Sequence, residues 1–171
     1  FFLAGSIILF QVAMTRVFAI MMWHHFTYMV ISVALLGFGA AGSILTARRE
    51  TARTDSPHRS LVTYTAAYSI AAVLAFCFTT QVRVDGLEIW RTKSNFIALL
   101  QIYLILCVPM LLGGLAIGVA LTRMVKHVNR LYFWDLLGSG VGGALAVFIL
   151  KGCGNAGAVM VAGAVGALGA F

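Results

Sequence analysis

The chain has 171 residues, of which 61% are hydrophobic and 10% are charged, and its mean hydropathy is +0.99. This composition excludes an ordinary soluble domain, in which about 45–50% of residues are apolar and about 25% are charged. The net charge of +7 lies in segments that flank apolar runs, which favours anionic lipid headgroups over nucleic acid as the partner. We therefore expect an integral membrane protein that contacts membrane lipid and binds no nucleic acid.

Apolar runs between charged segments predict an all-α, polytopic transmembrane helical bundle that forms a single domain over residues 1–171. A helix needs about 20 apolar residues to cross the hydrocarbon core of a bilayer. Both ends, at Phe1 and Phe171, interrupt apolar runs, so we expect a fragment of a longer chain. Pro109 should kink the fourth span, because it removes a backbone hydrogen bond. The six predicted spans are 1–22, 26–47, 60–80, 96–122, 131–150 and 155–171.

The loops after the second and fourth spans carry more Lys and Arg than the loops at the opposite ends of the helices. Cytoplasmic loops are enriched in these residues. We therefore place these loops and the N-terminus of the first span in the cytoplasm, in a membrane that we expect to be the bacterial inner membrane. The opposite loop contains VRVDGLEIW, residues 82–90, which indicates either a small hairpin or an irregular interfacial loop. The basic residues are Arg48, Arg49, Arg53, Arg59, Arg123, Lys126 and Arg130.

The segment GFGAAG, residues 37–42, has the glycine spacing of a dinucleotide-binding fingerprint. That fingerprint requires a strand-to-helix turn and an acidic residue about 20 positions later. The segment instead continues an apolar span without a turn, and small residues on one face of a membrane helix allow close packing of neighbouring helices. We predict a bundle that is closely packed through Gly and Ala faces, with packing glycines at Gly37, Gly39, Gly42, Gly114, Gly118, Gly138 and Gly142.

Two ionisable residues, Arg16 and Asp135, lie within predicted spans, where a charge is costly and points to function. A structural role explains each equally well: Arg16 can extend its side chain to the headgroups, and Asp135 sits near the positive end of its helix. As candidate ligand-binding residues we name Gln11, Arg16 and Asp135. Arg16 and Asp135 should lie at different depths, so we expect no direct ion pair between them. Asp135 should instead contact Arg130, Lys126 or His127.

Catalytic and metal-binding patterns are weak in this sequence. Histidines lie at span ends or in loops, so no pair of imidazoles is expected at the membrane midplane. The MMWHH segment at 21–25 has ligand types that suit copper, but adjacent helical positions point apart. The cysteines Cys77, Cys107 and Cys153 are scattered. We expect no catalytic residue, no metal and no cofactor in this segment.

Three segments together resemble the membrane-embedded region of spermidine synthase-like integral membrane proteins, which are similar to polyamine aminopropyltransferases. They are FQVAMTR at 10–16, VPMLLGGLAIGVAL at 108–121 and LYFWDLLGSGVGGAL at 131–145. Met14 stands where the family usually has Trp. The resemblance implies a polytopic helical region that precedes a soluble catalytic domain, whose glycine loop and acidic residues have no counterpart in this sequence. Gln11, Arg16 and Asp135 match the family's polar membrane positions.

The expected function is therefore that of a non-catalytic membrane domain of a spermidine synthase-like protein. It would anchor or scaffold an associated domain and would bind a small polar or cationic ligand near Asp135. One alternative is a membrane transporter or channel for a small solute, for which the kinked fourth span and the charges within spans argue. The other is an accessory structural subunit that packs against further transmembrane helices, in a homo-oligomer or in a larger membrane protein complex.

Overall fold

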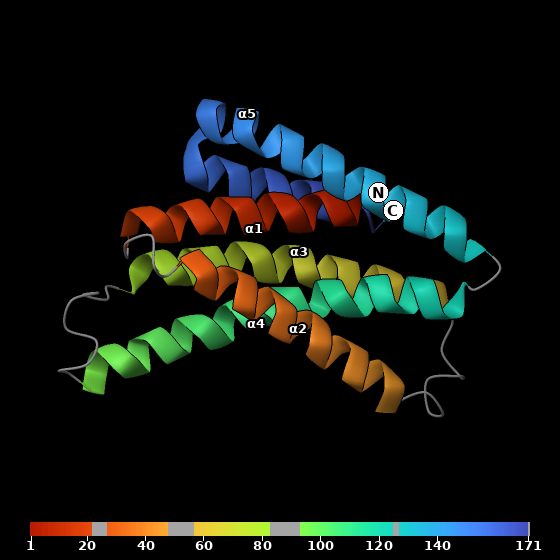
Figure 1. Cartoon of the computed structure of the whole chain (residues 1–171), viewed down its shortest axis with the longest axis horizontal. Coiled ribbons are helices and arrows are strands. Elements are labelled where there is room, and N and C mark those ends of the chain that lie inside the picture. The colour runs from red at the N-terminus through yellow and green to blue at the C-terminus, as the bar shows by residue number, and fades with distance from the viewer. Residues whose placement is uncertain (22–26, 48–56, 83–92, 125–126, 171) are drawn as a thin grey trace.

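The computed structural model describes residues 1–21, 27–47, 57–82, 93–124 and 127–170. Within these residues the fold is all-helical, as the sequence predicts. Each helix is long and apolar enough to cross a membrane. In chain order the five helices are α1 (Phe2–Met21), α2 (Thr27–Ala47), α3 (Pro57–Gln81), α4 (Lys93–Arg123) and α5 (Val128–Leu168) (Figure 1).

The prediction of six spans is wrong in number: the described residues form five helices. The predicted span at 131–150 and residues 155–168 of the predicted span at 155–171 both fall within α5, which continues without an intervening loop. The backbone leaves helical geometry at Gly154, where φ is 69° and ψ is −173°. Figure 1 shows that α5 turns back on itself at the end of the bundle that lies away from the N-terminus. The sequence analysis left residues 151–154 as a break between two spans, whereas the chain turns at one glycine.

The part of α5 before Gly154 runs parallel to α1. Gly138 contacts the backbone of Phe1, and Gly142 contacts the backbone of Gly5, so equal steps along both helices keep them in register. The glycines occur where the two backbones approach most closely, because any side chain there would separate the helices. This close contact fixes the first turns of α5 beside the first turn of α1.

The part of α5 after Gly154 runs back along another side of α1. The Ser6 hydroxyl donates a 2.6 Å hydrogen bond to the carbonyl oxygen of Ala162 and lies 3.1 Å from the Tyr68 hydroxyl on α3. Because Ser6 has one hydroxyl proton, the Tyr68 hydroxyl donates to Ser6. Ser6 and Tyr68 are fully buried. This cluster joins α1, α3 and the returning part of α5, and it satisfies polar groups that lie away from water.

Helices α2 and α4 pack through a second set of small residues. A Cβ atom added at Gly37 would lie 2.6 Å from Met110 Cβ, and one added at Gly114 would lie 2.9 Å from Ala41 Cβ. A Cβ atom at Gly118 would also collide with Leu45. The residue spacing thus places the small side of one helix against the other. Gly39 and Gly42, in contrast, face outward, and an added Cβ would meet no described atom within 4 Å.

Helix α4 contains Pro109 within its length. Figure 1 shows that α4 changes direction partway along: its second half lies beside α3, and its starting end points away from α3. A proline inside a helix produces such a bend because its ring crowds the preceding turn.

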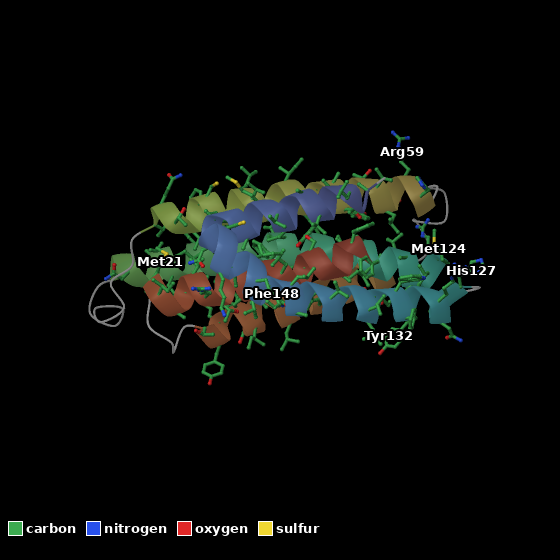
Figure 2. All side chains as sticks on the ribbon, turned by 90° about the horizontal axis from the view of Figure 1, so that it is seen from above. Met21, Arg59, Met124, His127, Tyr132 and Phe148 are labelled. Atoms are coloured by element: carbon green, nitrogen blue, oxygen red, sulfur yellow. The ribbon has the colours of Figure 1, made fainter. Side chains whose placement is uncertain are left out.

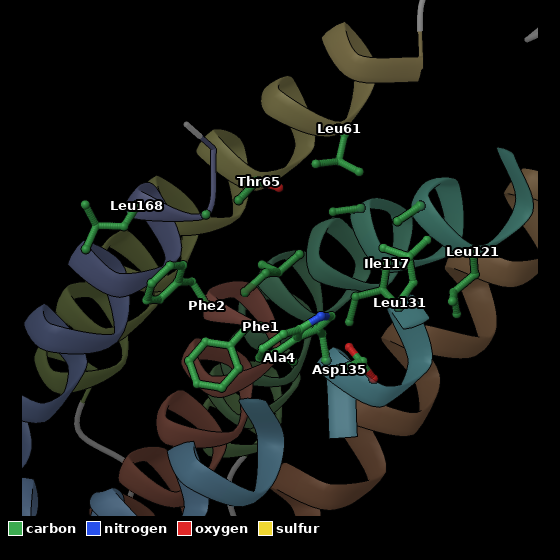
Figure 3. Close-up of a pocket in the computed structure, with 15 residues that line it drawn as sticks. Phe1, Phe2, Ala4, Leu61, Thr65, Ile117, Leu121, Leu131, Asp135 and Leu168 are labelled. Carbon is green, nitrogen blue, oxygen red and sulfur yellow. The ribbon is translucent and has the colours of Figure 1, made fainter. Parts of the chain in front are cut away.

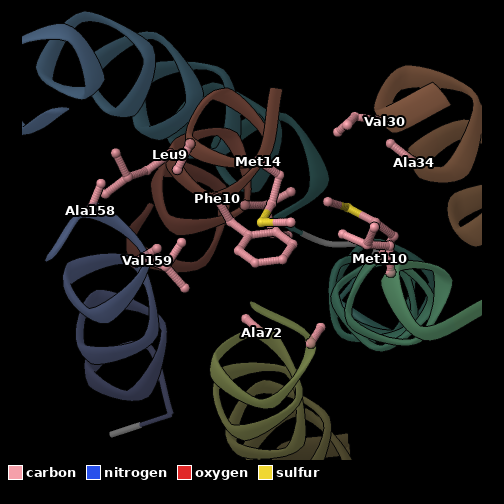
Figure 4. Packing of buried hydrophobic residues seen from close by; sticks show 14 of the residues in the cluster. Leu9, Phe10, Met14, Val30, Ala34, Ala72, Met110, Ala158 and Val159 are labelled. Carbon is pink, nitrogen blue, oxygen red and sulfur yellow. The ribbon is translucent and has the colours of Figure 1, made fainter. Parts of the chain in front are cut away.

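The core lies where α1 meets its neighbours. Phe10 and Met14 of α1 meet Ala72 of α3, Met110 of α4 and Val159 of α5, all of them buried (Figure 4). Large apolar side chains also cover the outside of the bundle: Leu35 and Phe148 are 70% and 71% exposed. Lipid tails solvate such a surface better than water does. The apolar exterior and the five apolar helices are those of an integral membrane protein.

Some predicted features fall partly or wholly outside the described residues. The possible hairpin at 82–90 falls outside them apart from Val82, and the MMWHH segment at 21–25 falls outside them apart from Met21. Most of the basic loop at 48–59 is also outside the described residues. The segment 37–42 lies inside α2, so its glycines are preceded by helix and not by the strand that a dinucleotide site requires. Arg59 and His127 lie at one end of the bundle and Met21 at the other (Figure 2).

Candidate functional site

A cavity of about 330 Å³ lies at the end of the bundle where α1, α3 and α5 begin and α4 ends (Figure 3). Its volume is in the range of small-molecule sites. Four helices contribute to the wall, and the returning end of α5 adds a further side. The lining residues are mostly apolar, and they include the polar side chains of Asp135 and Thr65. A mostly apolar wall with few polar groups is the usual form of a ligand site.

Asp135 is placed on this cavity by its spacing from the packing glycines of α5. Gly138 and Gly142 follow it by three and seven residues, which puts all three on one face of the helix. That face packs against α1, whose first residues line the cavity. The carboxylate is half-buried, and no ion pair joins it to Arg130 or His127, the two expected partners that the structure describes. Lys126 lies outside the described residues.

The described side chains that line the cavity carry charge of one sign. Among the lining side chains that the structure describes, Asp135 is the acid and none is basic. Aromatic rings stand beside it: Phe1 packs edge-on against Trp134 with ring centroids 6.0 Å apart, and both line the cavity. The face of an aromatic ring attracts cations. The wall therefore favours a positively charged group.

Thr65 is a second polar residue of this wall, and the sequence analysis did not identify it. Its side chain is fully buried, and its hydroxyl oxygen has no hydrogen-bond partner within the described parts of the chain. A threonine in an apolar helix carries no special signal in the sequence, since most such hydroxyls bond to their own helix. Only the tertiary structure shows that this hydroxyl is free.

The other two candidate ligand residues lie away from the cavity. Gln11 is half-buried and Arg16 is exposed, and both lie further along α1. The parallel register of α1 and α5 puts Asp135 about three residues before Phe1, so Arg16 lies roughly 27 Å further along the bundle at about 1.5 Å per residue. The structure therefore does not bring the three predicted residues together.

Metal and cofactor sites find no support in the described residues. Across the five described segments, no three His, Cys, Asp or Glu side chains gather in a way that would hold a metal ion. The cavity offers one carboxylate and one hydroxyl, which is too few ligands for a structural metal site.

No family model, curated protein or solved structure matches the chain. The resemblance to spermidine synthase-like membrane proteins thus depends on the three sequence segments that carry it. The cavity and its residues are accordingly the basis for the functional argument.

Proposed function

We propose that this chain is a non-catalytic membrane domain of a spermidine synthase-like protein and that it binds a small organic cation in the cavity next to Asp135. The observation that carries the proposal is the placement of Asp135, which is the acid of a cavity without basic side chains among its described lining residues. An ammonium group would contact the carboxylate, and an attached aliphatic segment would contact the apolar wall. The domain would hold this ligand while it anchors an associated catalytic domain.

The location of the cavity supports a role at the membrane surface. Arg59 and His127 mark the same end of the bundle (Figure 2), and the basic loops begin there. By the enrichment of cytoplasmic loops in Lys and Arg, we propose that this end faces the cytoplasm. A ligand would then enter from the cytoplasmic side, which is also the side where an associated soluble domain would lie.

Equilibrium binding tests the proposal. The full-length protein in lipid nanodiscs should bind labelled spermidine at one saturable site, and Asp135→Asn should weaken this binding by roughly tenfold or more. The reason is that a hydrogen bond to a charged group contributes about 1.5–3 kcal/mol, where about 1.4 kcal/mol is tenfold in affinity. Ser139→Ala is the matched control, since Ser139 lies one turn later on α5 and does not line the cavity. Equal binding by wild type and Asp135→Asn would overturn the proposal.

A further inference from the structure

Among the described residues, two helix hydroxyl groups are buried without a hydrogen-bond partner: that of Thr65, and that of Thr27 on α2, which does not line the cavity. Thr63, on the same turn of α3, donates a 2.9 Å hydrogen bond to the carbonyl oxygen of Arg59, and Thr79 donates a 2.7 Å bond to that of Ala75. These bonds to the preceding turn are the usual way in which a threonine satisfies its hydroxyl within a helix. Thr65 makes no such bond, although its side chain is fully buried.

A buried hydroxyl without a partner is costly, because it has lost its bonds to water and gained none in exchange. Thr65 and Asp135 line the same cavity from different helices: Thr65 belongs to α3 and Asp135 to α5 (Figure 3). Apolar side chains line the same cavity, among them Ile117 and Leu131. The cavity wall therefore combines a carboxylate, apolar side chains and Thr65, whose buried hydroxyl is unpaired among the described residues, all from different parts of the chain.

We propose that Thr65 is a specificity residue, which selects aliphatic amines that carry a second hydrogen-bonding group over plain alkylamines. This inference rests on the proposed cation site. The ammonium group contacts Asp135, the carbon chain lies against the apolar wall, and a terminal hydroxyl or amine bonds to the Thr65 hydroxyl. Such a ligand satisfies a polar group that the protein itself leaves unpaired, whereas a plain alkylamine would place a methyl group against it.

The test compares amino alcohols of increasing chain length with the alkylamines in which a methyl group replaces the hydroxyl. In the wild-type protein, one chain length should bind about tenfold more tightly as the amino alcohol, the value of one well-formed hydrogen bond. In Thr65→Val, which keeps the shape of the side chain, the ratio of the two affinities should fall to about one. Thr79→Val is the matched control on α3, and it should leave the ratio as in the wild type.

Stability gives an independent reading of the same hydroxyl. Without ligand, Thr65→Val should have a melting temperature equal to or above that of the wild type, because it removes an unpaired polar group. Thr79→Val should melt lower, because it removes a formed hydrogen bond. If Thr65→Val does not yield folded protein, Thr65→Ala and Thr65→Ser provide the same comparison, with the ratio lost in the first and retained in the second.

Failure of this inference differs from failure of the cation site. If amines bind in an Asp135-dependent manner but the amino alcohols have no advantage at any chain length, or keep it in Thr65→Val, Thr65 has no role in selection. If Asp135→Asn binds every amine as the wild type does, the cation site itself is refuted.

The same chemistry occurs in a lipid headgroup that contains ethanolamine. Nanodiscs with and without this lipid distinguish the sources: competition between the lipid and the soluble amino alcohol identifies the headgroup as the occupant, and its absence identifies the soluble amine. Competition that persists in Asp135→Asn would contradict the assignment to this cavity.

Discussion

Gly142→Leu is expected to prevent α1 and α5 from packing together. A Cβ atom at this position would lie 2.6 Å from Gly5 Cα and would collide with the Gly5 carbonyl oxygen. These are backbone atoms, so no side chain can rotate to make room, and the two helices would have to separate. Helix contacts in lipid depend on such close packing. We expect a loss of about 1–3 kcal/mol or more in the free energy of unfolding, the range for overpacked cores.

Gly140→Leu is the matched control for this change. Gly140 lies on the same helix, faces outward and has no described atom within 4 Å of an added Cβ. Unfolding by a denaturing detergent, followed by circular dichroism, should show the wild-type midpoint for Gly140→Leu and a lowered midpoint for Gly142→Leu. Equal midpoints would show that the α1 and α5 backbones are not in contact at Gly142.

Gly154→Ala should destabilise the reversal of α5. Gly154 has φ 69° and ψ −173°, a region that is essentially restricted to glycine and costs about 1–3 kcal/mol for other residues. Leu168 and Gly169, which line the cavity, follow this turn. The variant should therefore lower both the free energy of unfolding and the affinity for a cationic ligand.

Gly152→Ala provides the comparison for the turn. Gly152 lies two residues earlier and is exposed. A Cβ atom added there would meet no described atom within 4 Å. Thermal unfolding should separate the two variants, with Gly152→Ala close to the wild type. A Gly154→Ala protein that melts and binds like the wild type would mean that the chain does not turn through this conformation.

The helical class and the first four helices follow from the sequence because their apolar runs are separated by charged or aromatic segments. α1 to α4 lie within a few residues of the predicted ranges. The reversal at Gly154 could not be predicted in the same way. It lies in a glycine-rich segment that differs little from the packing faces elsewhere, and nothing in the residue pattern separates a glycine that turns the chain from one that packs.

The sides of the helices were harder to predict than their ends. In water, the apolar face of a helix indicates the core, but in lipid both faces are apolar. The spacing of Gly37, Gly39 and Gly42 therefore could not distinguish Gly37, which contacts α4, from Gly39 and Gly42, which face outward. A partner outside the described residues would be needed to give those two glycines a packing role.

The candidate site was predictable to the extent that a charge in a span is expensive. This argument identified Asp135, which lines the cavity, and equally identified Arg16, which does not. Thr65 had no signal of its own, because the state of its hydroxyl depends on neighbouring helices. A site assembled from four helices becomes visible only when the helices are placed relative to one another.

Protection of a cysteine inside the cavity tests the central claim most directly. Leu131 lines the cavity, and a substitution at this position keeps the carboxylate of Asp135. Leu131→Cys, in a background where Cys77, Cys107 and Cys153 are alanine, should react with a water-soluble thiol reagent, and spermidine should slow this reaction. Asn129→Cys, at an exposed position at the start of α5 outside the cavity, should react at the same rate with or without spermidine. A rate for Leu131→Cys that does not change with spermidine would contradict the account.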